Sequence, residues 1–402
     1  MKLLLAAIAS LLFVLSANRC LARERQELLS EELCLLGFEN VKVLTSGNIL
    51  LACMENNIYG WNVEGIVIVL DCLSKNSTAE KEIILYALDH GIPQIRIKVN
   101  SLAWKSFRNG EIQAHALRKM LSVDSKLQKD YKLLENTLYW NSNLNKIDFV
   151  IYPQFALQNT GFNQIYETQL NLAPAMEVDL WKGMQFTGQV IFPLHNELSK
   201  EGDEVRPGFV SISQNFRIAS DYFGKLVVGN FNANRYGGYM SMRRPIWKNR
   251  IEIGANAGIT GSSYFYKGRW LKGNVNELNW FLKARYFHHR YDLQFDLSYG
   301  KYIAGDHGIR ADLTRHFGRI AIGCYVMCSD GRSNGGFHFS LPLAKKQNRR
   351  HLIRIKPANF FDWEYNAGTE FVKGRYYETR PNENRTENNY NPMYLKTQLL
   401  NL

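Results

Sequence analysis

After Lys146 the chain alternates polar and apolar residues with a period of two. From Tyr291 to Tyr299 one face carries Tyr291, Leu293, Phe295, Leu297 and Tyr299, and the other carries Asp292, Gln294, Asp296 and Ser298. The same alternation runs through 168–177 and 184–192, and further runs begin near Phe149, Phe209, Leu226, Tyr236, Ile251, Leu278, Ile309, Ile320 and Phe337. A period of two is typical of β-strands. The pattern predicts about twelve strands, many close to the ~10 residues of a membrane-spanning strand.

This alternation fits two architectures. In a soluble sandwich the apolar residues face inward, whereas in an outer-membrane barrel they face lipid and the polar residues line the lumen. Aromatic residues near the strand ends favour the barrel, because they resemble interface girdles. The polar face carries amides and charges that suit a wet lumen: Gln169, Asn171, Gln185, Gln189, Glu252, Lys283, Arg285, Asp292, Asp296, Arg310 and Asp312. We therefore predict an all-β antiparallel barrel of outer-membrane type over residues 146–345, closed by an even number of strands.

Residues 23–142 mix helical and strand periods and predict a small α/β module. Helices are expected at 23–37, ended by Gly37, at 78–91, capped by Thr78, and at 111–123; strands are expected at 41–44, 48–54, 65–71 and 93–99. The segment has no glycine-rich phosphate loop and no nucleophile elbow. The fold class is thus an α+β N-terminal module followed by the barrel, and the module is expected to bind or adapt rather than catalyse.

The first 22 residues predict a secretory signal, with an apolar run from Leu3 to Leu15 and a small-x-small cleavage site at Cys20–Ala22. Cys20 is alternatively the acylated cysteine of a lipoprotein, although Asn18 and Arg19 are poor residues for that signal. Export places the barrel in the outer membrane and the module in the periplasm, and it makes nucleic acid an improbable partner. No later run of about 18 apolar residues predicts a spanning helix.

The net charge is +12 and aromatic residues make up 13% of the chain. Such an excess of positive charge serves solubility or contact with an anionic partner such as lipid phosphate or acidic polysaccharide. Basic runs at 241–245 and 345–351 are either solvated loops or contacts of that kind. Among the cysteines, Cys34, Cys53 and Cys72 are expected to be buried. Cys324 and Cys328 share a strand face but lie too far apart to bridge, and we predict no metal and no cofactor.

The stretch from Tyr299 to Arg319 interrupts its alternation with Gly305, Asp306, His307 and Gly308. The two glycines permit positive φ at a tight turn or bulge, and Asp306 can bond to backbone amides or reach Arg310 or Arg315. One interpretation is a corner at the barrel rim. The other is a charged cluster facing the lumen, formed by Asp306, Arg310, Asp312 and Arg315.

The segment Gly300–Gly323 resembles the C-terminal signature of the YjbH family, outer-membrane proteins linked to exopolysaccharide and group-4 capsule production. The matching residues are Gly300, Lys301, Tyr302, Ala304, Gly305, Asp306, Gly308, Arg315, Phe317 and Gly323. His338–Leu343 looks like the closing segment of that signature. The family usually has Asn-Gly after the phenylalanine, whereas this chain has only Gly318 after Phe317. The resemblance implies a non-catalytic accessory barrel in polysaccharide assembly or secretion. Its partners would be outer-membrane lipid, anionic exopolysaccharide and other polysaccharide-export proteins.

Two other functions remain open. A barrel hydrolase acting on lipid or polysaccharide would need a nucleophile and a base, for which Ser211, Ser213, His288 and His316 are candidates, although no spacing singles out a triad. A purely structural barrel is the third reading. His288 and His289 are expected at a turn, on opposite faces. The segment 346–402 is expected to be ordered to about Gly374 and loose beyond it.

Overall fold

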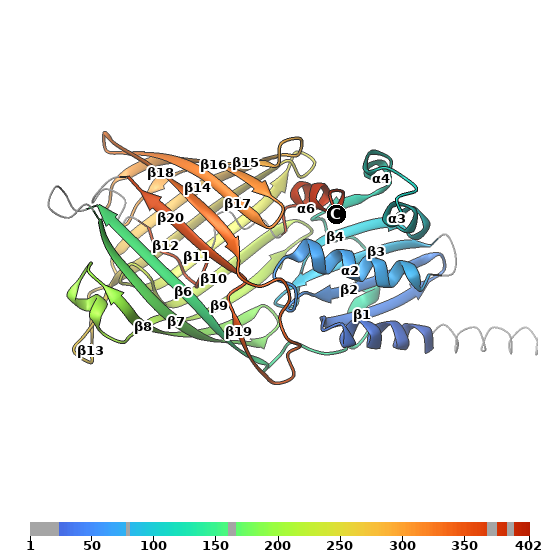
Figure 1. Cartoon of the computed structure of the whole chain (residues 1–402), viewed down its shortest axis with the longest axis horizontal. Helices are drawn as coiled ribbons and strands as arrows, with labels where there is room; N and C mark the ends of the chain where they lie inside the picture. The colour runs from blue at the N-terminus through green and yellow to red at the C-terminus, as the bar shows by residue number, and fades with distance from the viewer. Residues whose placement is uncertain (1–23, 78–80, 160–165, 368–375, 384–389) are drawn as a thin grey trace, which may run out of the picture.

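The computed structural model describes residues 24–77, 81–159, 166–367, 376–383 and 390–402. A small module of helices and strands lies at one end of a large rolled sheet, along the long axis of the molecule (Figure 1). The predicted signal at 1–22, including Cys20, and the predicted cap Thr78 lie outside the described residues.

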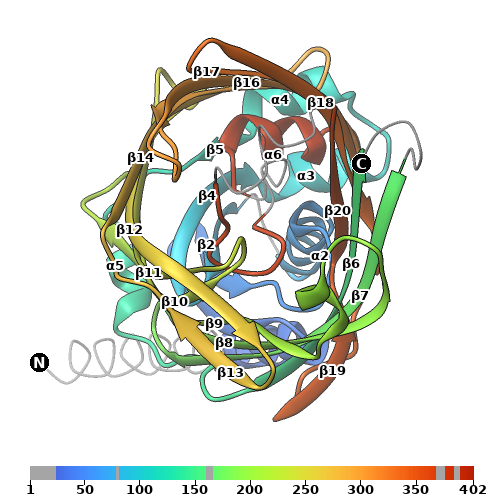
Figure 2. The same cartoon turned by 90° about the vertical axis from the view of Figure 1, so that its left-hand side faces the viewer.

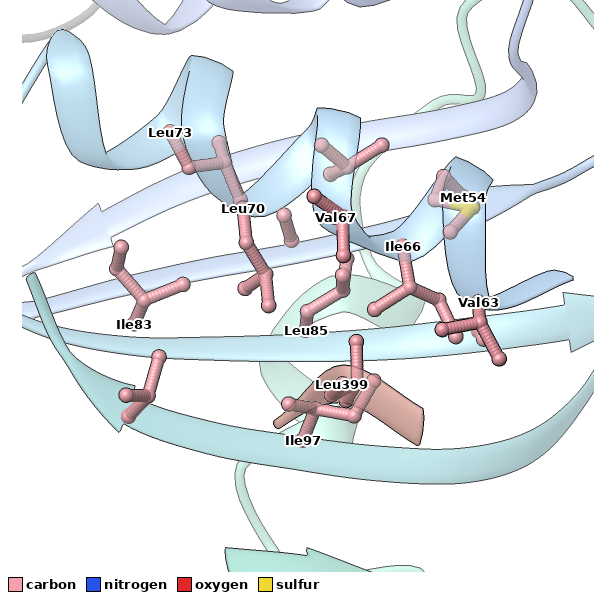
Figure 3. Close-up of a cluster of buried hydrophobic side chains, with 14 of the residues drawn as sticks. Met54, Val63, Ile66, Val67, Leu70, Leu73, Ile83, Leu85, Ile97 and Leu399 are labelled. Carbon is pink, nitrogen blue, oxygen red and sulfur yellow. The ribbon is translucent and has the colours of Figure 1, made fainter. Parts of the chain in front are cut away.

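The module is built on a five-stranded sheet with the order β1-β2-β3-β4-β5. Its strands are β1 (Glu39–Ser46), β2 (Ile49–Glu55), β3 (Glu82–Asp89), β4 (Ile92–Asn100) and β5 (Ser122–Asp124). Its helices are 24–35, α2 (Asn62–Lys75), α3 (Ser101–Arg108), α4 (Ala114–Met120) and α5 (Tyr131–Glu135). β2 and β3 pair in parallel and the other neighbours are antiparallel. α2 covers one face of this sheet and buries its apolar side against it (Figure 3).

Two predictions for the module are wrong. Residues 65–71, expected to form a strand, belong to α2, and 82–89, expected to be helical, form β3. In α2 the buried Val63, Ile66, Leu70 and Leu73 follow a helical spacing that the β-branched run obscures. β3 lies between two strands with six consecutive buried residues, so its continuous apolar run is that of a strand covered on both faces.

Each of the twelve predicted runs after Lys146 is a strand. They are β6 (Ile147–Asn159), β7 (Tyr166–Trp181), β8 (Met184–Asn196), β9 (Arg206–Ile218), β10 (Tyr222–Phe231), β11 (Arg235–Ile246), β12 (Ile251–Tyr266), β14 (Glu277–His288), β15 (Leu293–Lys301), β16 (His307–Phe317), β17 (Ile320–Ser329) and β18 (Arg332–Pro342). The short 3-10 helix η1 (Lys200–Asp203) precedes β9, and β13 (Arg269–Lys272) extends β12 as a hairpin. Consecutive strands pair antiparallel, and the sheet curves around a central space (Figure 2).

The wall continues beyond the predicted end at 345. β19 (Ile353–Pro357) pairs in parallel with β6, and β20 (Phe360–Asn366) pairs antiparallel with β18. β20 is therefore a thirteenth wall strand, and the expected closure by an even, wholly antiparallel set is wrong. Among the described strands the hydrogen-bonded order is a path with two ends, β19 and β20, rather than a closed ring.

β20 nevertheless lies beside β6, the strand that also pairs with β19 (Figure 2). The Ala358 amide donates to the Ile151 carbonyl at 3.0 Å, which extends the parallel contact by one residue. Further along, the rings of Phe155 and Trp363 lie 5.8 Å apart across the seam. In an antiparallel wall of thirteen strands the first and the last strand run in the same direction. The contact of β6 with the stretch that forms β19 and β20 is therefore parallel.

The distribution of apolar and polar side chains on the rolled sheet is the reverse of that in a soluble protein. On β16, Ile309 and Leu313 are 44% and 45% exposed, whereas Arg310 and Thr314 are 5% and 1% exposed. On β17, Val326 is 63% exposed. Apolar side chains thus cover the outside and polar ones fill the inside. This contradicts the sandwich, whose apolar residues would face inward.

The remaining expectations concern helices and cysteines. No helix in the described part of the chain has the length and apolarity to cross a bilayer. Cys34, Cys53 and Cys72 are buried, as predicted, and Cys324 and Cys328 on β17 are not bridged, as predicted; both of these thiols are exposed.

Candidate functional site

The four residues of the predicted charged cluster, Asp306, Arg310, Asp312 and Arg315, do not lie together in the structure. Arg310 and Asp312 point into the lumen, where the Arg310 guanidinium donates to Asp312 at 2.6 Å. Arg315 is exposed on the outer face, with its guanidinium 4.9 Å from the Phe317 ring. The prediction that Arg315 joins the cluster is wrong, because a two-residue period sends 310 and 312 inward and 315 outward.

Asp306 lies apart from these charges, in the loop between β15 and β16. Its carboxylate accepts a hydrogen bond from the Ser329 hydroxyl, and its carbonyl accepts one from the Tyr302 amide at 2.8 Å. These contacts make the loop a structural corner, which supports the first of the two interpretations given above.

The motif glycines serve two purposes. Gly305 has φ +91° in open space, as predicted for a tight turn. Positive φ at Gly308 is wrong: this residue lies in β16, and a Cβ there would be 2.5 Å from the Cys328 carbonyl oxygen. Gly300 and Gly323 are also strand glycines, where a Cβ would lie 1.9 Å from the Trp280 oxygen and 2.6 Å from the Leu313 oxygen. Close approach of backbone therefore explains three of the four.

The C-terminal segment runs through the lumen (Figure 2). Tyr376 joins the Arg310 cluster: its hydroxyl accepts from Arg310 at 3.0 Å and donates to Glu364 at 2.6 Å. Arg310 also donates to Glu364 at 2.7 Å and lies 3.8 Å from the centre of the Tyr325 ring. This cluster connects β16, β17, β20 and the tail.

Deeper contacts fix the next tail residues. The ring of Tyr377 stacks on Phe231, with centroids 5.3 Å apart and planes 5° apart, and its hydroxyl donates to Asn279 at 3.1 Å. Glu383 pairs with Lys225 at 3.1 Å. Sequence reasoning missed these residues; their only signal was the mix of tyrosines and charges at 376–383, which is unusual for a loose tail.

The tail ends in α6 (Pro392–Leu399), which packs into the module core through Leu395 and Leu399. The Tyr394 hydroxyl accepts from the Trp61 indole at 2.9 Å, and its ring lies 5.5 Å from that of Phe287 on β14. The prediction that the chain is loose beyond Gly374 is therefore wrong for 376–383 and 390–402. Nothing in the local sequence shows that these residues find partners more than 100 positions away.

A buried charged junction holds the module to β7. The His90 ring contacts Asp179 at 2.6 Å, and the Asn143 amide bridges Glu55 and Asp179 at 3.2 and 2.8 Å. Glu55 also accepts from the Gly91 amide at 2.8 Å. Burial raises the pKa of Glu55 to about 7. Burial alone would lower the pKa of His90, but nearby Asp179 and Asp89 outweigh it and raise that pKa to about 10.

Glu55, His90 and Asp179 bring three metal-ligating atoms within 4.8 Å of one another. A metal binds neutral imidazole, and the raised pKa of His90 favours the imidazolium that pairs with Asp179, so a metal would have to displace that proton. The carboxylates are occupied by amide donors. The arrangement is thus an ion-paired junction.

A second junction lies next to the first, because the Asn57 amide donates both to Glu39 at 2.6 Å and to Glu55 at 3.4 Å. Arg350 contacts Glu39 of β1 and Asp148 of β6, and Arg354 of β19 donates to Asp148 at 2.7 Å. The basic run at 345–351 was expected to be a solvated loop or an anion contact. For Arg350 it is instead a buried link between module and wall.

A cavity of ≈ 500 Å³ lies where module, wall and tail meet. Its lining includes His90 and Gln94 from the module, Arg243 and Glu252 from the wall, and Arg380 from the tail. Most of the lining residues are polar or charged, and Phe216, Phe223 and Met242 are among the apolar ones.

The hydrolase candidates do not assemble. Ser211 donates to the Thr379 carbonyl at 3.3 Å, and His316 pairs with Gln294 at 2.9 Å. In the described part of the chain, none of the four candidates makes a Ser–His hydrogen bond. His288 and His289 stack with ring centroids 5.8 Å apart, contrary to the expectation of opposite faces, because His289 already belongs to the turn.

Comparison with known proteins gives distant structural matches only. No family model matches the chain, and no curated protein matches it. OmpT of Vibrio cholerae, an outer membrane protein, in a form lacking loop L8, is similar at 8% identity over 48% of this chain and 86% of its own, with a TM-score of 0.28. The E1M, A104W mutant of the Rh. blastica porin is similar at 11% identity over 55% of this chain and 98% of its own, with a TM-score of 0.31. TM-scores of this size do not define a fold relationship, so the proposals below rest on burial and contacts.

Proposed function

We propose that this protein is an outer-membrane β-barrel whose small α/β module lies in the periplasm. One observation carries the membrane assignment: the strands expose their apolar side chains outward and bury charged and amide side chains inward. Such a surface would aggregate in water and is the surface that lipid requires.

The lengths of the turns support the orientation. Turns that meet the module are short, at 182–183, 219–221 and 247–250, and the Gly183 amide donates to the His90 carbonyl at 2.7 Å. At the opposite end the connection from β8 to β9 covers 197–205 and that from β12 to β14 includes an extra strand. Outer-membrane barrels have short turns on the periplasmic side and longer loops outside.

The biological role that we propose is accessory and non-catalytic, in the assembly or secretion of exopolysaccharide or capsule. The Gly300–Gly323 resemblance to the YjbH family supports it. A lumen occupied by the tail argues for gripping or docking rather than free diffusion of solutes. The engagement of Ser211 and His316 elsewhere removes the support for a hydrolase.

A deletion strain tests this role. Surface polysaccharide is measured in the deletion strain and in strains complemented with the wild-type chain or with Tyr377→Ala. Loss of polysaccharide on deletion and recovery with the wild-type chain are expected, with partial recovery by the tail variant. Unchanged polysaccharide in the deletion strain would contradict the role while leaving the membrane assignment intact.

A further inference from the structure

The ≈ 500 Å³ cavity at the junction has three independent walls. The module contributes Asn56 and Gln94, the strands contribute Ser241 and Asn256, and the tail contributes Asn391. Its volume falls within the range of about 300–1,000 Å³ that small-ligand pockets have. Such pockets are mostly apolar, whereas this one is lined by amides and charges, so an apolar ligand would leave those groups unsatisfied.

The charges on the wall are matched in pairs. Arg243 contacts Glu252 at 2.8 Å and Arg285 contacts Asp296 at 2.6 Å. Further ion pairs on the lining are Asp148 with Arg350 and Lys356, Asp179 and Asp89 with His90, and Glu383 with Lys225. An entering ion of either sign would meet a nearly balanced field and gain little Coulomb energy to offset its lost hydration.

Hydrogen-bonding capacity remains on the same wall. The Asn256 amide donates to the Tyr239 hydroxyl at 2.8 Å, and its buried Oδ1 has no hydrogen-bond partner among the described residues. A buried acceptor of this kind is costly unless a ligand or water meets it. The Phe216 ring also borders the cavity: it lies over Gly224, where a Cβ would be 2.2 Å from the ring.

We propose that this cavity binds an uncharged, polyhydroxylated ligand, the chemistry of a neutral sugar segment. Hydroxyl groups both donate and accept, so they fit amides and paired charges, and an aromatic ring offers a face to the C–H side of a sugar. The assignment rests on the proposed role in polysaccharide export. The net charge of +12 alone suggested an anionic polymer, whereas the paired charges of the cavity favour a neutral segment.

Binding is tested on the full chain in lipid nanodiscs, because maltoside detergents would compete. Isothermal titration uses maltohexaose as the neutral probe and an oligogalacturonate of similar length as the anionic probe, at low and high salt. Ser241→Phe fills the cavity and Asn256→Ala removes the free acceptor. Ile259→Phe, on the lipid-facing side of β12, is the matched control. Heat-modifiability verifies that each variant is folded.

We expect maltohexaose to bind with an affinity that salt does not change. Ser241→Phe should weaken it at least tenfold, Asn256→Ala several-fold, and Ile259→Phe not at all. Tighter, salt-sensitive binding of oligogalacturonate would overturn the neutral class, and no binding of either probe to folded protein would overturn the site. Maltohexaose binding together with unchanged polysaccharide in the deletion strain would support the cavity and refute the proposed role.

Discussion

At the scale of single residues, Tyr377 of the tail packs so closely against Gly258 that no side chain fits at position 258. A Cβ at Gly258 would lie 1.9 Å from the Tyr377 hydroxyl and 2.8 Å from Asn279 Oδ1, the acceptor of that hydroxyl. We predict that Gly258→Ala expels Tyr377 from its stack on Phe231, at a cost of about 1–3 kcal/mol typical of overpacking. Limited proteolysis of the folded protein should then cut the tail faster.

Gly238 provides the control for this change. A Cβ there meets nothing within 4 Å, and the residue lies on the neighbouring strand β11. Gly238→Ala should leave tail proteolysis as in the wild type. Equal cleavage of both variants and the wild type would mean that Tyr377 does not hold the tail.

The His90–Asp179 contact makes module docking depend on pH. The pKa of His90 is raised in the folded protein to about 10, from an ordinary value near 6.5. Its contribution to stability is therefore complete below about pH 6.5 and is lost as the pH rises towards 10. We predict that the urea midpoint of the module falls over this range and that His90→Gln flattens the fall. A midpoint of the wild type that stays constant from pH 6.5 to 10 would rule out an ion pair here.

At the scale of elements, α6 contacts both the module core and strand β14 of the rolled sheet. Leu395 and Leu399 are fully buried, whereas Leu402 is half exposed. Leu395→Ala should destabilise the module by about 2–5 kcal/mol, as core leucine truncations do, and Leu402→Ala should have little effect. Urea unfolding followed by tryptophan fluorescence, to which Trp61 beside Tyr394 and the buried Trp104 contribute, compares the two. Similar midpoints would show that α6 is not part of the module core.

Element prediction from the sequence succeeded where the period was strict. All twelve strands up to β18 follow a two-residue alternation that burial in a curved sheet imposes. β20 carries the same signal, with Phe361, Trp363 and Tyr365 alternating with Asp362 and Glu364. It was missed because the basic segment 345–351 separates it from the other strands.

The errors elsewhere have physical causes. β3 and α2 are both nearly continuous apolar runs, for which periodicity alone does not distinguish helix from strand. The inward Arg310 and Asp312 were predictable from their spacing. Glu364 was not, because it lies on the additional wall strand β20, and Tyr376 was not, because it meets Arg310 only through the return of the chain into the lumen.

At the scale of the whole molecule, the outward apolar surface determines where the protein resides. Leu282 lies near the middle of β14 and is 56% exposed, and Leu138 lies in the module and is 89% exposed. Leu282→Arg should cost about 2–4 kcal/mol if that side chain sits near the bilayer midplane, whereas Leu138→Arg should cost nothing. The amount of assembled protein in the outer-membrane fraction measures the difference. Equal yields for the two variants would argue that Leu282 does not face lipid.

The most direct test of the membrane assignment is fractionation of the expressed full chain, followed by electrophoresis of the outer-membrane fraction with and without boiling. An outer-membrane β-barrel should resist cold detergent and shift its mobility on boiling. We predict that shift, together with recovery from the outer-membrane fraction. A soluble periplasmic protein whose mobility does not change on boiling would contradict the account, since the exposed apolar faces of the strands would then need another partner.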